Sequence, residues 1–527
     1  MFKITKGNFK KQIYGNEDYL LNWPMLYILT NGKQAYIGES NHVKNRMSQH
    51  HTSADKRVFN EAYFIYSSKF NQPVTLDYES KLIQYMAADQ VYEVRNKNAG
   101  MADQNYYGKE AYDREFRVLW RSLRREKLVK HSLEELENSN LFKYSPYKEL
   151  NNDQRTAAES IVEHLKKEEA QVAVVDGVPG SGKTIVAIYL MKYLKDSEEF
   201  RGKKIGFVVP QTSLRATLKG TFKGVYGLQA RDVISPSAAA KECYDILIVD
   251  EVHRLHQYKN ISYRGAFKKN CERIGLTTDS DELDWILHQC KCAVLFYDKL
   301  QVVGPSCIGG ERFRSKMERE KKKRTVSRHT LWTQMRVKGG EGYIEYVRDL
   351  IRGKVKEKKV FDQYEFKLMT DFKAFDELMH QKEERESLVR MIAGYAWDWA
   401  SKRDKSLYDI EIQGIKKQWN YCTEGWVHFD GALEQVGCIH SVQGYDLNYA
   451  FVIVGNEIGY DVKKDRIIIR PDKYYDQNGK NTAGYEELKE YIQSIYYVLF
   501  TRGIKGTYLY VCDPGLRAYL SRYVDVV

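Results

Sequence analysis

The stretch DGVPGSGKTIVA, residues 176–187, places three glycines before a Lys-Thr pair and decides the fold. A short apolar run, QVAVVD, leads into it, and IVAIYLMKYL after it repeats apolar residues with helical spacing. This order predicts a strand, a glycine turn and a helix. Backbone N–H groups at the start of such a helix can surround phosphate groups. The stretch therefore predicts a phosphate-binding loop, with a chance glycine turn as the alternative.

The loop predicts ATP and Mg²⁺ as cofactors. Lys183 can neutralise the oxygens of the β- and γ-phosphates, and the hydroxyl of Thr184 can take one position around Mg²⁺. The residues predicted to bind the nucleotide here are Gly177, Gly180, Ser181, Gly182, Lys183 and Thr184.

Strand-like runs alternate with helical runs after the loop, which is typical of a parallel sheet with crossover helices. The first set is QVAVVD, KIGFVVP, DILIVDE and CAVLFYD, and a second set, CIHSVQ, YAFVIVG and TYLYVCD, occupies the last third. We therefore expect an α/β protein with two parallel-sheet lobes behind a small N-terminal domain. The expected parts are an N-terminal α+β domain at 1–110, a basic helical connector at 111–150, a first lobe at 151–325 and a second lobe at 326–527.

Length and composition predict a multidomain protein of the cytoplasm. At about 150 residues per domain, 527 residues correspond to three or four compact units. Apolar runs such as IYYVLF are far shorter than the ~20 residues of a membrane span, so no membrane partner is expected. The start of the chain lacks the apolar core of a secretory signal, and the eight cysteines are scattered, which favours a reducing compartment.

The positive charge of the chain favours an anionic partner. The formal net charge is +12, and Arg312 to Arg328 alone contains nine Lys or Arg. A second basic cluster runs from Arg121 to Lys130, and the chain has 40 tyrosines. Lys and Arg neutralise backbone phosphates while aromatic rings stack on bases, so the pattern predicts nucleic-acid binding. Solvated charged loops, with the tyrosines in cores, are the alternative.

Carboxylates and amides follow the predicted strands at positions suited to ATP hydrolysis. Asp250 and Glu251 end the run DILIVDE, where Asp250 can hold Mg²⁺ through water and Glu251 can orient the attacking water. Gln301 follows the next strand and can sense the γ-phosphate. Gln154, upstream of the loop, can read the edge of adenine with its paired donor and acceptor.

In this order, the motifs resemble those of superfamily 1 helicase-like ATPases, and more closely a bacterial DNA/RNA helicase domain group of uncertain role, over about residues 140–527. The resemblance implies two RecA-like lobes, with nucleic acid contacted by PQTSLR at 210–215. It also implies a nucleotide contact at Gly444, within HSVQGYDLNY. Arg336 and Arg502 would stabilise the transferred phosphoryl group when the cleft closes, with an interdomain salt bridge as the alternative. No long insertion separates Glu251 from Asp298, which favours translocation or ATP-driven switching over unwinding.

The N-terminal run PMLYILTNGKQAYIGES, residues 24–40, predicts two strands joined at Asn31-Gly32 by a type I′ turn. Arg46 and His50 are four residues apart and would share one face of a helix. Glu79 would stand at the start of an amphipathic helix. Phenols, a cation, an imidazole and a carboxylate together suit metal-assisted cleavage of a phosphodiester.

This segment, about residues 20–110, resembles the GIY-YIG nuclease family. Leu26-Tyr27 and Tyr36-Ile37-Gly38 match the motif that names it, although Met25 replaces the opening glycine. The resemblance implies that Tyr27 acts as the base or helps to activate it. Tyr36 would help to position water and phosphate.

The same resemblance assigns the remaining residues of this domain. Glu79 would bind one Mg²⁺ or Mn²⁺, and Arg46 would stabilise the charge that develops on the phosphorus. His50 would act with Tyr36 on water and phosphate, and Asn96 would brace the site. A degenerate module that only binds nucleic acid is the alternative.

The combined expectation is an ATP-dependent endonuclease coupled to a helicase-like motor, with nucleic acid as partner and DNA favoured over RNA. Defence against foreign nucleic acid is the expected setting, with repair as another. The competing hypotheses are an NTPase switch with an inactive N-terminal docking module, and a scaffold that uses ATP only for stability. The sequence identifies no protein partner.

Overall fold

The computed structural model of the chain describes residues 2–12, 14, 22–97, 106–167, 169–422, 425–442, 445–481 and 483–527. The chain forms two compact units. The first comprises residues 1–158, 184–202 and 218–232, and the second comprises 159–183, 203–217 and 233–527. Within the described residues, no helix is both long and apolar enough to span a membrane.

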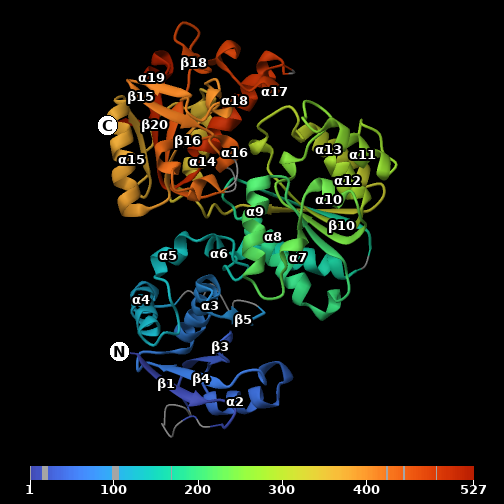
Figure 1. Cartoon of the computed structure of the whole chain (residues 1–527), viewed down its shortest axis with the longest axis vertical. Coiled ribbons are helices and arrows are strands. Elements are labelled where there is room, and N and C mark those ends of the chain that lie inside the picture. Colours follow the sequence, from blue (N-terminus) through green and yellow to red (C-terminus); the bar gives the residue numbers. More distant parts are fainter. Residues whose placement is uncertain are drawn as a thin grey trace. The chain divides into compact units, whose positions relative to one another are not determined.

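The first unit contains a five-stranded sheet in the order β1-β4-β2-β3-β5. Figure 1 labels β1, β3, β4 and β5 of this sheet. Its strands are β1 (Lys3–Asn8), β2 (Met25–Thr30), β3 (Gln34–Ser40), β4 (Glu61–Tyr66) and β5 (Glu93–Val94). All neighbours are antiparallel except β3 and β5. The central strand β2 is buried at every residue. It shares a core with Val43 and Met47 of α2 (Val43–Thr52), which fixes the helix that carries two predicted site residues.

The turn between β2 and β3 differs from the prediction. Strand pairing centres it on Gly32-Lys33 rather than on Asn31-Gly32, and Gly32 has a φ of +83° while Asn31 has no positive φ. A positive φ at the first central residue alone is the pattern of a type II′ turn. The side chain of Asn31 accepts hydrogen bonds from the N–H groups of Lys33 and Gln34, at 3.0 and 2.8 Å, so it caps the turn from outside its centre.

Helix α3 (Gln72–Asp89) begins earlier than expected, so Glu79 lies in its middle and not at its start. The Asn71 side chain caps it by accepting from the N–H of Val74. Its inward face includes Leu82, Ile83 and Met86, as predicted.

The predicted connector folds onto α3. It contains α4 (Lys109–Arg125), α5 (Leu133–Asn138) and α6 (Asn140–Lys143). Phe116 and Trp120 of α4 are buried, and their rings lie 5.7 and 5.6 Å from that of Tyr85 on α3. The connector is therefore part of the first unit's core.

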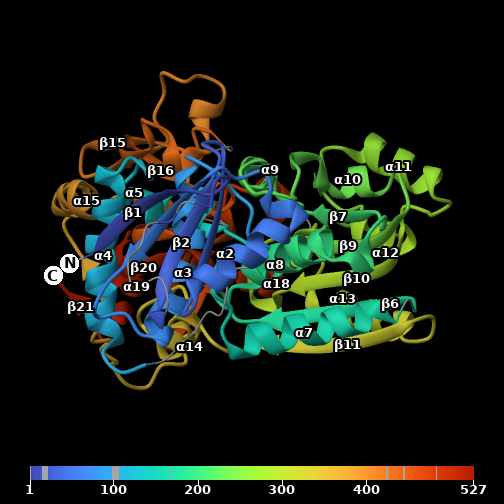
Figure 2. The same ribbon diagram turned by 90° about the horizontal axis from the view of Figure 1, so that it is seen from below.

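The second unit begins with a six-stranded parallel sheet in the order β11-β6-β10-β9-β7-β8, most of which can be followed in Figure 2. Its strands are β6 (Gln171–Gly177), β7 (Ile205–Val208), β8 (Val233–Ile234), β9 (Tyr244–Val249), β10 (Cys290–Tyr297) and β11 (Thr325–Leu331). Because β11 pairs with β6 along its length, this first sheet extends past the expected lobe boundary at residue 325.

Short helices of the second unit bury the apolar residues of this sheet. Leu247 and Leu295 share a core with Leu283, Ile286 and Phe313. The helices of this core are α10 (Pro236–Ala239), α12 (Glu282–His288) and α13 (Gly310–Glu320), whereas α11 (Arg264–Arg273) packs against Trp285 of α12 in a separate core. Three further helices have residues in both units: α7 (Asn152–Lys166), α8 (Lys183–Asp196) and α9 (Thr212–Lys223).

A second sheet of eight strands follows, in the order β14-β15-β16-β13-β17-β20-β12-β21. Its strands are β12 (Glu365–Met369), β13 (Val389–Ala393), β14 (Ile410–Ile412), β15 (Ile415–Trp419), β16 (Gln435–Gly437), β17 (Leu447–Val454), β20 (Gly503–Val511) and β21 (Asp525–Val526). Only β14 and β15 pair antiparallel. A separate ribbon pairs β18 (Ile458–Asp461) with β19 (Arg466–Ile469). The helices are α14 (Gly340–Ile351), α15 (Phe372–Glu386), α16 (Ile439–Val442), α17 (Gln477–Lys480), α18 (Tyr485–Phe500) and α19 (Pro514–Leu520).

Both faces of the second sheet are covered, as its apolar strands require. Along β17, Ala450 and Val452 belong to the core that includes α14 and α18, whereas Phe451 and Ile453 belong to the core that includes α15. The prediction of a strand over CIHSVQ was wrong, because a short helix, α16, follows β16 there.

Candidate functional site

The glycine loop follows β6 and bends as the predicted phosphate-binding loop requires. Gly180 and Gly182 have φ values of +84° and +78°, a region that L side chains seldom enter. Ser181 is buried, and its N–H donates to the carbonyl of Val178 at 3.1 Å. The loop therefore wraps back on itself directly before helix α8 begins.

Lys183 lies in a network of polar contacts at the ends of β6 and β10. Its ammonium donates to the carbonyls of Gly177 and Val178, at 2.8 and 3.1 Å, and to the carboxylate of Asp298 at 3.0 Å. The amide of Gln301 donates to the same carboxylate oxygen at 2.7 Å. The loop lysine and the predicted γ-phosphate sensor are thus joined through one buried acid.

Asp250 and Glu251 lie at the end of β9, where the sequence places the metal and water-activating pair. Asp250 is buried and accepts a hydrogen bond from the N–H of Glu251 at 3.0 Å. Glu251 has a φ of +53°, a strained conformation for a side chain of its size. Its carboxylate lies 2.8 Å from Nε2 of the fully buried His253. Burial alone would raise the pKa of Glu251. The nearby His253, Arg254 and Lys183 lower it by more than burial raises it, so the carboxylate stays ionised.

Arg336 lies against the glycine loop. A Cβ built on Gly180 would stand 2.9 Å from the Cβ of Arg336, and the N–H of Met335 donates to the carbonyl of Gly180 at 3.0 Å. The guanidinium forms an ion pair with Asp446, which lies in the run HSVQGYDLNY. Arg336 therefore links the phosphate loop to the second sheet.

The other residues that are predicted to contact the nucleotide lie on several different elements. Arg502 is buried at the start of β20, and its Nε donates to the carbonyl of Val498 at 3.2 Å. Gln154 is buried in α7, where its side chain accepts from the N–H of Asn151 at 3.1 Å. Thr184 is the second residue of α8. Gly444 lies outside the described residues.

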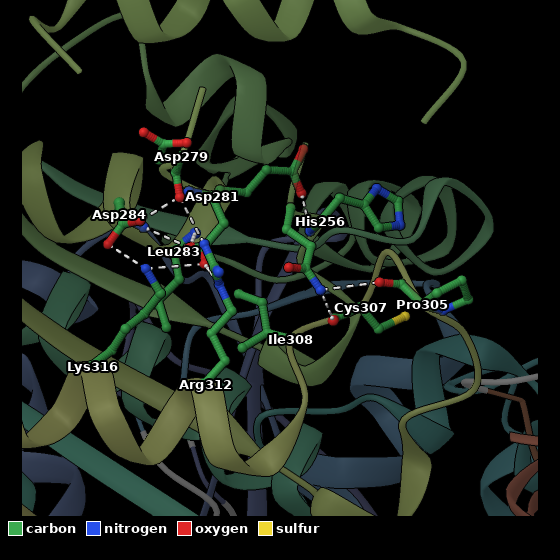
Figure 3. Close-up of polar contacts among 12 residues, drawn as sticks. His256, Asp279, Asp281, Leu283, Asp284, Pro305, Cys307, Ile308, Arg312 and Lys316 are labelled. Atoms are coloured by element: carbon green, nitrogen blue, oxygen red, sulfur yellow. Dashed lines mark hydrogen bonds and ion pairs between the residues drawn. The ribbon is translucent and has the colours of Figure 1, made fainter. Parts of the chain in front are cut away.

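Part of the basic cluster at 312–328 has a structural role. Asp281 caps α12, and Arg312 and Lys316 of α13 contact its carboxylate at 2.7 and 3.0 Å (Figure 3). Lys316 also forms an ion pair with Asp284. Arg324 donates to the carbonyl of Leu287 at 3.0 Å. Three of the nine basic residues therefore stabilise the fold, which weakens the sequence argument for a nucleic-acid surface at this cluster.

In the first unit, the structure brings the predicted phenol and imidazole together. The hydroxyl of Tyr27 lies 2.8 Å from Nε2 of His50. Both side chains are buried, and burial raises the pKa of Tyr27 and lowers that of His50 to about 4. Tyr27 and His50 are therefore both neutral at physiological pH, and the tautomer of His50 sets which of the two donates. Gly38 faces Tyr27 across the β2–β3 pair, and a Cβ there would collide with the phenol.

Cations surround the second phenol. The ring of Tyr36 lies 5.4 Å from that of His50, and the ammonium of the buried Lys56 lies 3.3 Å from the centre of the Tyr36 ring. The hydrogen bond between the Arg46 guanidinium and Tyr27, with a smaller contribution from Tyr36, raises the pKa of Arg46. The sequence did not predict a role for Lys56, because this residue lies in the 3₁₀ turn after α2 and belongs to no recognisable motif.

Two carboxylates lie together beside these groups. Burial and the charge of Glu39 raise the pKa of Glu79 to about 7, and Glu79 also accepts a hydrogen bond from the N–H of Glu39. Glu39 itself accepts from the hydroxyl of Thr75 at 3.2 Å, and burial raises its pKa. Glu39 directly follows Tyr-Ile-Gly, so the sequence contained the signal for this second acid.

Asn96 braces the strand that carries the second phenol. Its side-chain amide accepts from the N–H of Ile37 at 3.0 Å and donates to the carbonyl of Ile37 at 2.8 Å. The hydroxyl of Tyr147 donates to the carbonyl of Asn96 at 3.0 Å and fixes its position. Both backbone groups of Ile37 depend on this one side chain.

We expect Asn96→Ala to loosen β3, because it leaves two buried polar groups of Ile37 without partners, at about 1–3 kcal/mol each. Hydrogen–deuterium exchange at the amide of Ile37 should accelerate at least about tenfold. The exposed Asn45→Ala on α2 is the control and should leave this amide unchanged. Equal exchange in the two variants would show that Asn96 does not hold the strand.

The carboxylates at the glycine-loop site and at the N-terminal site are suitable ligands for divalent metals. Within the described residues, no cluster of three or more His, Cys, Asp or Glu side chains is placed to hold a metal ion. Mg²⁺ uses one or two carboxylates and completes its shell with water and substrate phosphates, so it does not need such a cluster. Asp250 at the loop site and Glu79 with Glu39 in the first unit fit this pattern.

Residues 170–513 match the family described as Schlafen group 3, DNA/RNA helicase domain. An uncharacterised protein of Saccharomyces cerevisiae, YPL245W, is 29% identical over 308 residues, which cover 53% of the chain and 64% of the yeast protein. The replication restart protein PriA of Bacillus subtilis is 30% identical over 161 residues, which cover 29% of the chain and 19% of PriA. The chain thus spans less than two thirds of the length of each relative.

Solved structures show weaker likeness. A Pif1 helicase from Bacteroides is 12% identical, with a TM-score of 0.31 over 68% of the chain and 92% of that structure. Mss116p is 11% identical, with a TM-score of 0.33 over 71% of the chain and 74% of that structure. The family match covers the glycine loop, the Asp250-Glu251 pair, Arg336 and Arg502. The chain therefore belongs to the Schlafen group 3 DNA/RNA helicase domain family, whose members carry a helicase-like ATPase domain.

Proposed function

We propose that the chain is an ATP-driven motor that moves on nucleic acid. The observation that carries this proposal is the position of Arg336 against Gly180, since an arginine joined to the second sheet can act on phosphates in the glycine loop. Hydrolysis spreads negative charge over the transferred phosphoryl group. Lys183 and Arg336, with Arg502 on closure, neutralise this charge, and Glu251 orients the attacking water.

The remaining loop-site residues hold the nucleotide. The N–H groups around Gly180 and Gly182 bind phosphate oxygens, Gln154 reads adenine, and Gln301 responds to the γ-phosphate through Asp298. Thr184 and Asp250 hold Mg²⁺, which supplies electrostatic stabilisation of the phosphates when bound. Movement would follow from closing and reopening of the lobes during turnover.

We further propose that the N-terminal domain cleaves phosphodiesters. The contact between Tyr27 and His50 supports a proton relay, in which Tyr27 passes its proton to Nε2 of His50 as it takes one from the attacking water. Tyr36 and Lys56 position the phosphate, and Arg46 balances its charge. Glu79 and Glu39 hold a divalent metal, which acts as a Lewis acid when bound.

The test uses the full chain with labelled single-stranded, duplex and branched DNA and RNA, each with and without ATP and with Mg²⁺ or Mn²⁺. Nucleic-acid-stimulated ATP hydrolysis and metal-dependent nicking are expected together. ATP hydrolysis that ignores every nucleic acid would overturn the motor. Absence of nicking on all substrates would make the first domain a docking module of an NTPase switch.

The Glu79 carboxyl gives metal binding a pH dependence. Its pKa is raised to about 7 in the folded chain, so below that pH a proton competes with the metal. We expect Mn²⁺ affinity, measured by calorimetry, to rise about tenfold per pH unit up to pH 7 and then to level off. Glu79→Gln should remove this dependence. A flat profile in the unmodified chain would argue against Glu79 as the ligand.

The pairing of a motor with a cutting domain leads us to propose a role in defence against foreign nucleic acid. The support is the domain combination alone. Protection of a host culture against phage should then require both Lys183 and Glu79, and protection that survives their substitution would remove the proposal.

A further inference from the structure

Lys192 is a buried cation on α8, the helix that begins at Lys183 of the glycine loop. It is 3% exposed and forms an ion pair with Asp196, one turn further along the helix. Gly227, whose φ is +82°, packs against this pair: a Cβ built there would stand 2.8 Å from Oδ1 of Asp196 and 3.5 Å from the ammonium. The ammonium is therefore held in one place, although neither ATP hydrolysis nor strand cleavage uses it directly.

Two tyrosine rings of the first unit lie beside this ammonium. Its Nζ is 5.9 Å from the ring centre of Tyr147 and 5.8 Å from that of Tyr226. A cation within about 6 Å of a ring centre is attracted to the negative face of the ring. The guanidinium carbon of Arg95 lies 3.9 Å from the ring centre of Tyr226, so this ring lies close to two cations. The rings thus join α8 to the segment that carries Arg95.

Tyr147 connects α8 to β3, the strand that carries Tyr36. Its side chain is 1% exposed, and its hydroxyl donates to the carbonyl of Asn96 at 3.0 Å. The side-chain amide of Asn96 in turn binds the N–H and the carbonyl of Ile37, at 3.0 and 2.8 Å. Ile37 directly follows Tyr36. A series of direct contacts therefore runs from the Lys192 ammonium to the backbone beside the second phenol of the proposed cleavage site.

α8 can transmit a change from its first residue to Lys192. It is one continuous helix of 14 residues, and Lys192 lies nine residues, or about 14 Å, after Lys183. Val186 and Leu190 are fully buried, so we expect the helix to move as one body. A triphosphate that binds Lys183 exchanges with the carboxylate of Asp298, which changes the contacts of the first turn. Packed helices pass on such changes as shifts of about 1–2 Å.

We propose that Lys192 and Tyr147 are positioning residues for strand cleavage, which couple the nucleotide at the start of α8 to the position of Asn96 and β3. A triphosphate restricts the movement of α8, so the contact of Lys192 with Tyr147 and the hydrogen bond to Asn96 become more ordered. The phenols of the cleavage site are then better preorganised. This inference rests on the proposed strand cleavage and on nucleotide binding at the glycine loop, and it requires no movement along a strand.

The first experiment uses the unmodified full chain and needs no cleavage. Hydrogen–deuterium exchange at the amide of Ile37 is measured with and without Mg²⁺ and AMP-PNP, a nucleotide that is not hydrolysed. We expect the bound nucleotide to slow this exchange at least about fivefold. Lys183→Ala should remove the effect. Exchange that stays unchanged in a chain that calorimetry shows to bind AMP-PNP would overturn the proposal.

The second experiment breaks the series of contacts at one atom. Tyr147→Phe keeps the ring beside Lys192 and removes the hydroxyl that donates to Asn96. The effect of AMP-PNP on the exchange of Ile37 should fall below about twofold, while ATP hydrolysis stays within about twofold of the parental rate. A full nucleotide effect in Tyr147→Phe would contradict the proposal.

Gln90→Asn is the matched control, because Gln90 makes a different contact within the first unit. Its side-chain amide donates at 3.0 Å to the carbonyl of Gly224, directly after α9. Asparagine tolerates the φ of +57° at this position, but its side chain is too short to keep the contact. This variant should keep the full nucleotide effect, and circular dichroism confirms that both variants fold. Equal loss in the two variants would overturn the path through Tyr147.

The third experiment measures cleavage itself, in single-turnover conditions with saturating labelled strand. AMP-PNP should raise the cleavage rate at least about fivefold and leave the strand concentration for half-maximal rate within about twofold. An effect confined to strand affinity would overturn the proposal. Exchange at Ile37 that depends on nucleotide, in a chain that cuts nothing, would remove the proposed cleavage and retain the coupling. Cleavage whose rate ignores AMP-PNP would retain the cleavage and remove the coupling.

Discussion

Substitution of Lys183 by alanine is expected to lower ATP hydrolysis by about 10²–10³-fold, because a preorganised charge on the transferred phosphoryl group is lost. The substitution also leaves the buried carboxylate of Asp298 without its cation, since Lys183 and Asp298 are 8% and 3% exposed. Steady-state phosphate release with saturating single strand is the measurement.

The control for Lys183→Ala is Lys291→Ala, an exposed lysine on β10 of the same sheet. It should hydrolyse ATP at the rate of the unmodified chain. ATP hydrolysis by Lys183→Ala at the parental rate would show that the glycine loop is not the hydrolytic site.

Substitution of Glu79 by glutamine is expected to lower strand cleavage by about 10³-fold, since the Lewis-acid contribution of a bound metal is several kcal/mol. ATP hydrolysis should not change, because Glu79 belongs to the proposed strand-cleavage site and not to the glycine-loop site. Nicking of labelled DNA or RNA in single-turnover conditions gives the rate, and calorimetry with Mn²⁺ gives the accompanying loss of metal affinity.

Glu110→Gln, an exposed acid in the first turn of α4, is the matched control and should cut normally. If Glu79→Gln still cuts at the parental rate, the carboxylate pair is not the metal site. If it loses metal affinity and keeps its cleavage rate, the metal has a structural role only.

The parts of the fold that depend on short-range signals were predictable. The glycine loop is one, because Gly180 and Gly182 supply the positive φ values that the turn needs and the apolar strand lies next to them in sequence. Continuous apolar runs also located β6, β7, β9, β10, β17 and β20. Periodicity failed at CIHSVQ, where Ser441 and Cys438 exchange hydrogen bonds that close a helical turn.

The turn in the N-terminal hairpin failed for a related reason. The Asn31-Gly32 pair favours positive φ at both residues, but the Asn31 side chain can instead accept two backbone N–H groups, which moves the turn by one residue. The turn propensity of the Asn-Gly dipeptide does not take into account these side-chain hydrogen bonds, which compete with the type I′ turn. The strands and their pairing were nevertheless as predicted.

The sequence predicted only part of each candidate site, because several site residues are far apart in the sequence and contact one another only in the folded chain. Arg254 and His440 are 186 positions apart, and neither is part of a pattern that indicates their contact. Lys56 has no motif, and its place over Tyr36 follows from the packing of the turn after α2. Glu39 was within reach, since it directly follows Tyr-Ile-Gly.

The ammonium of Lys183 forms an ion pair with Asp298 at 3.0 Å, so an anion that binds to Lys183 in the loop competes with this carboxylate. Any anion that enters must exchange with a carboxylate already in place. Chloride or bicarbonate offers no more charge than this internal rival and fewer simultaneous contacts, whereas a triphosphate offers several oxygens and a larger charge. The pair therefore favours polyphosphates over monovalent anions at this loop.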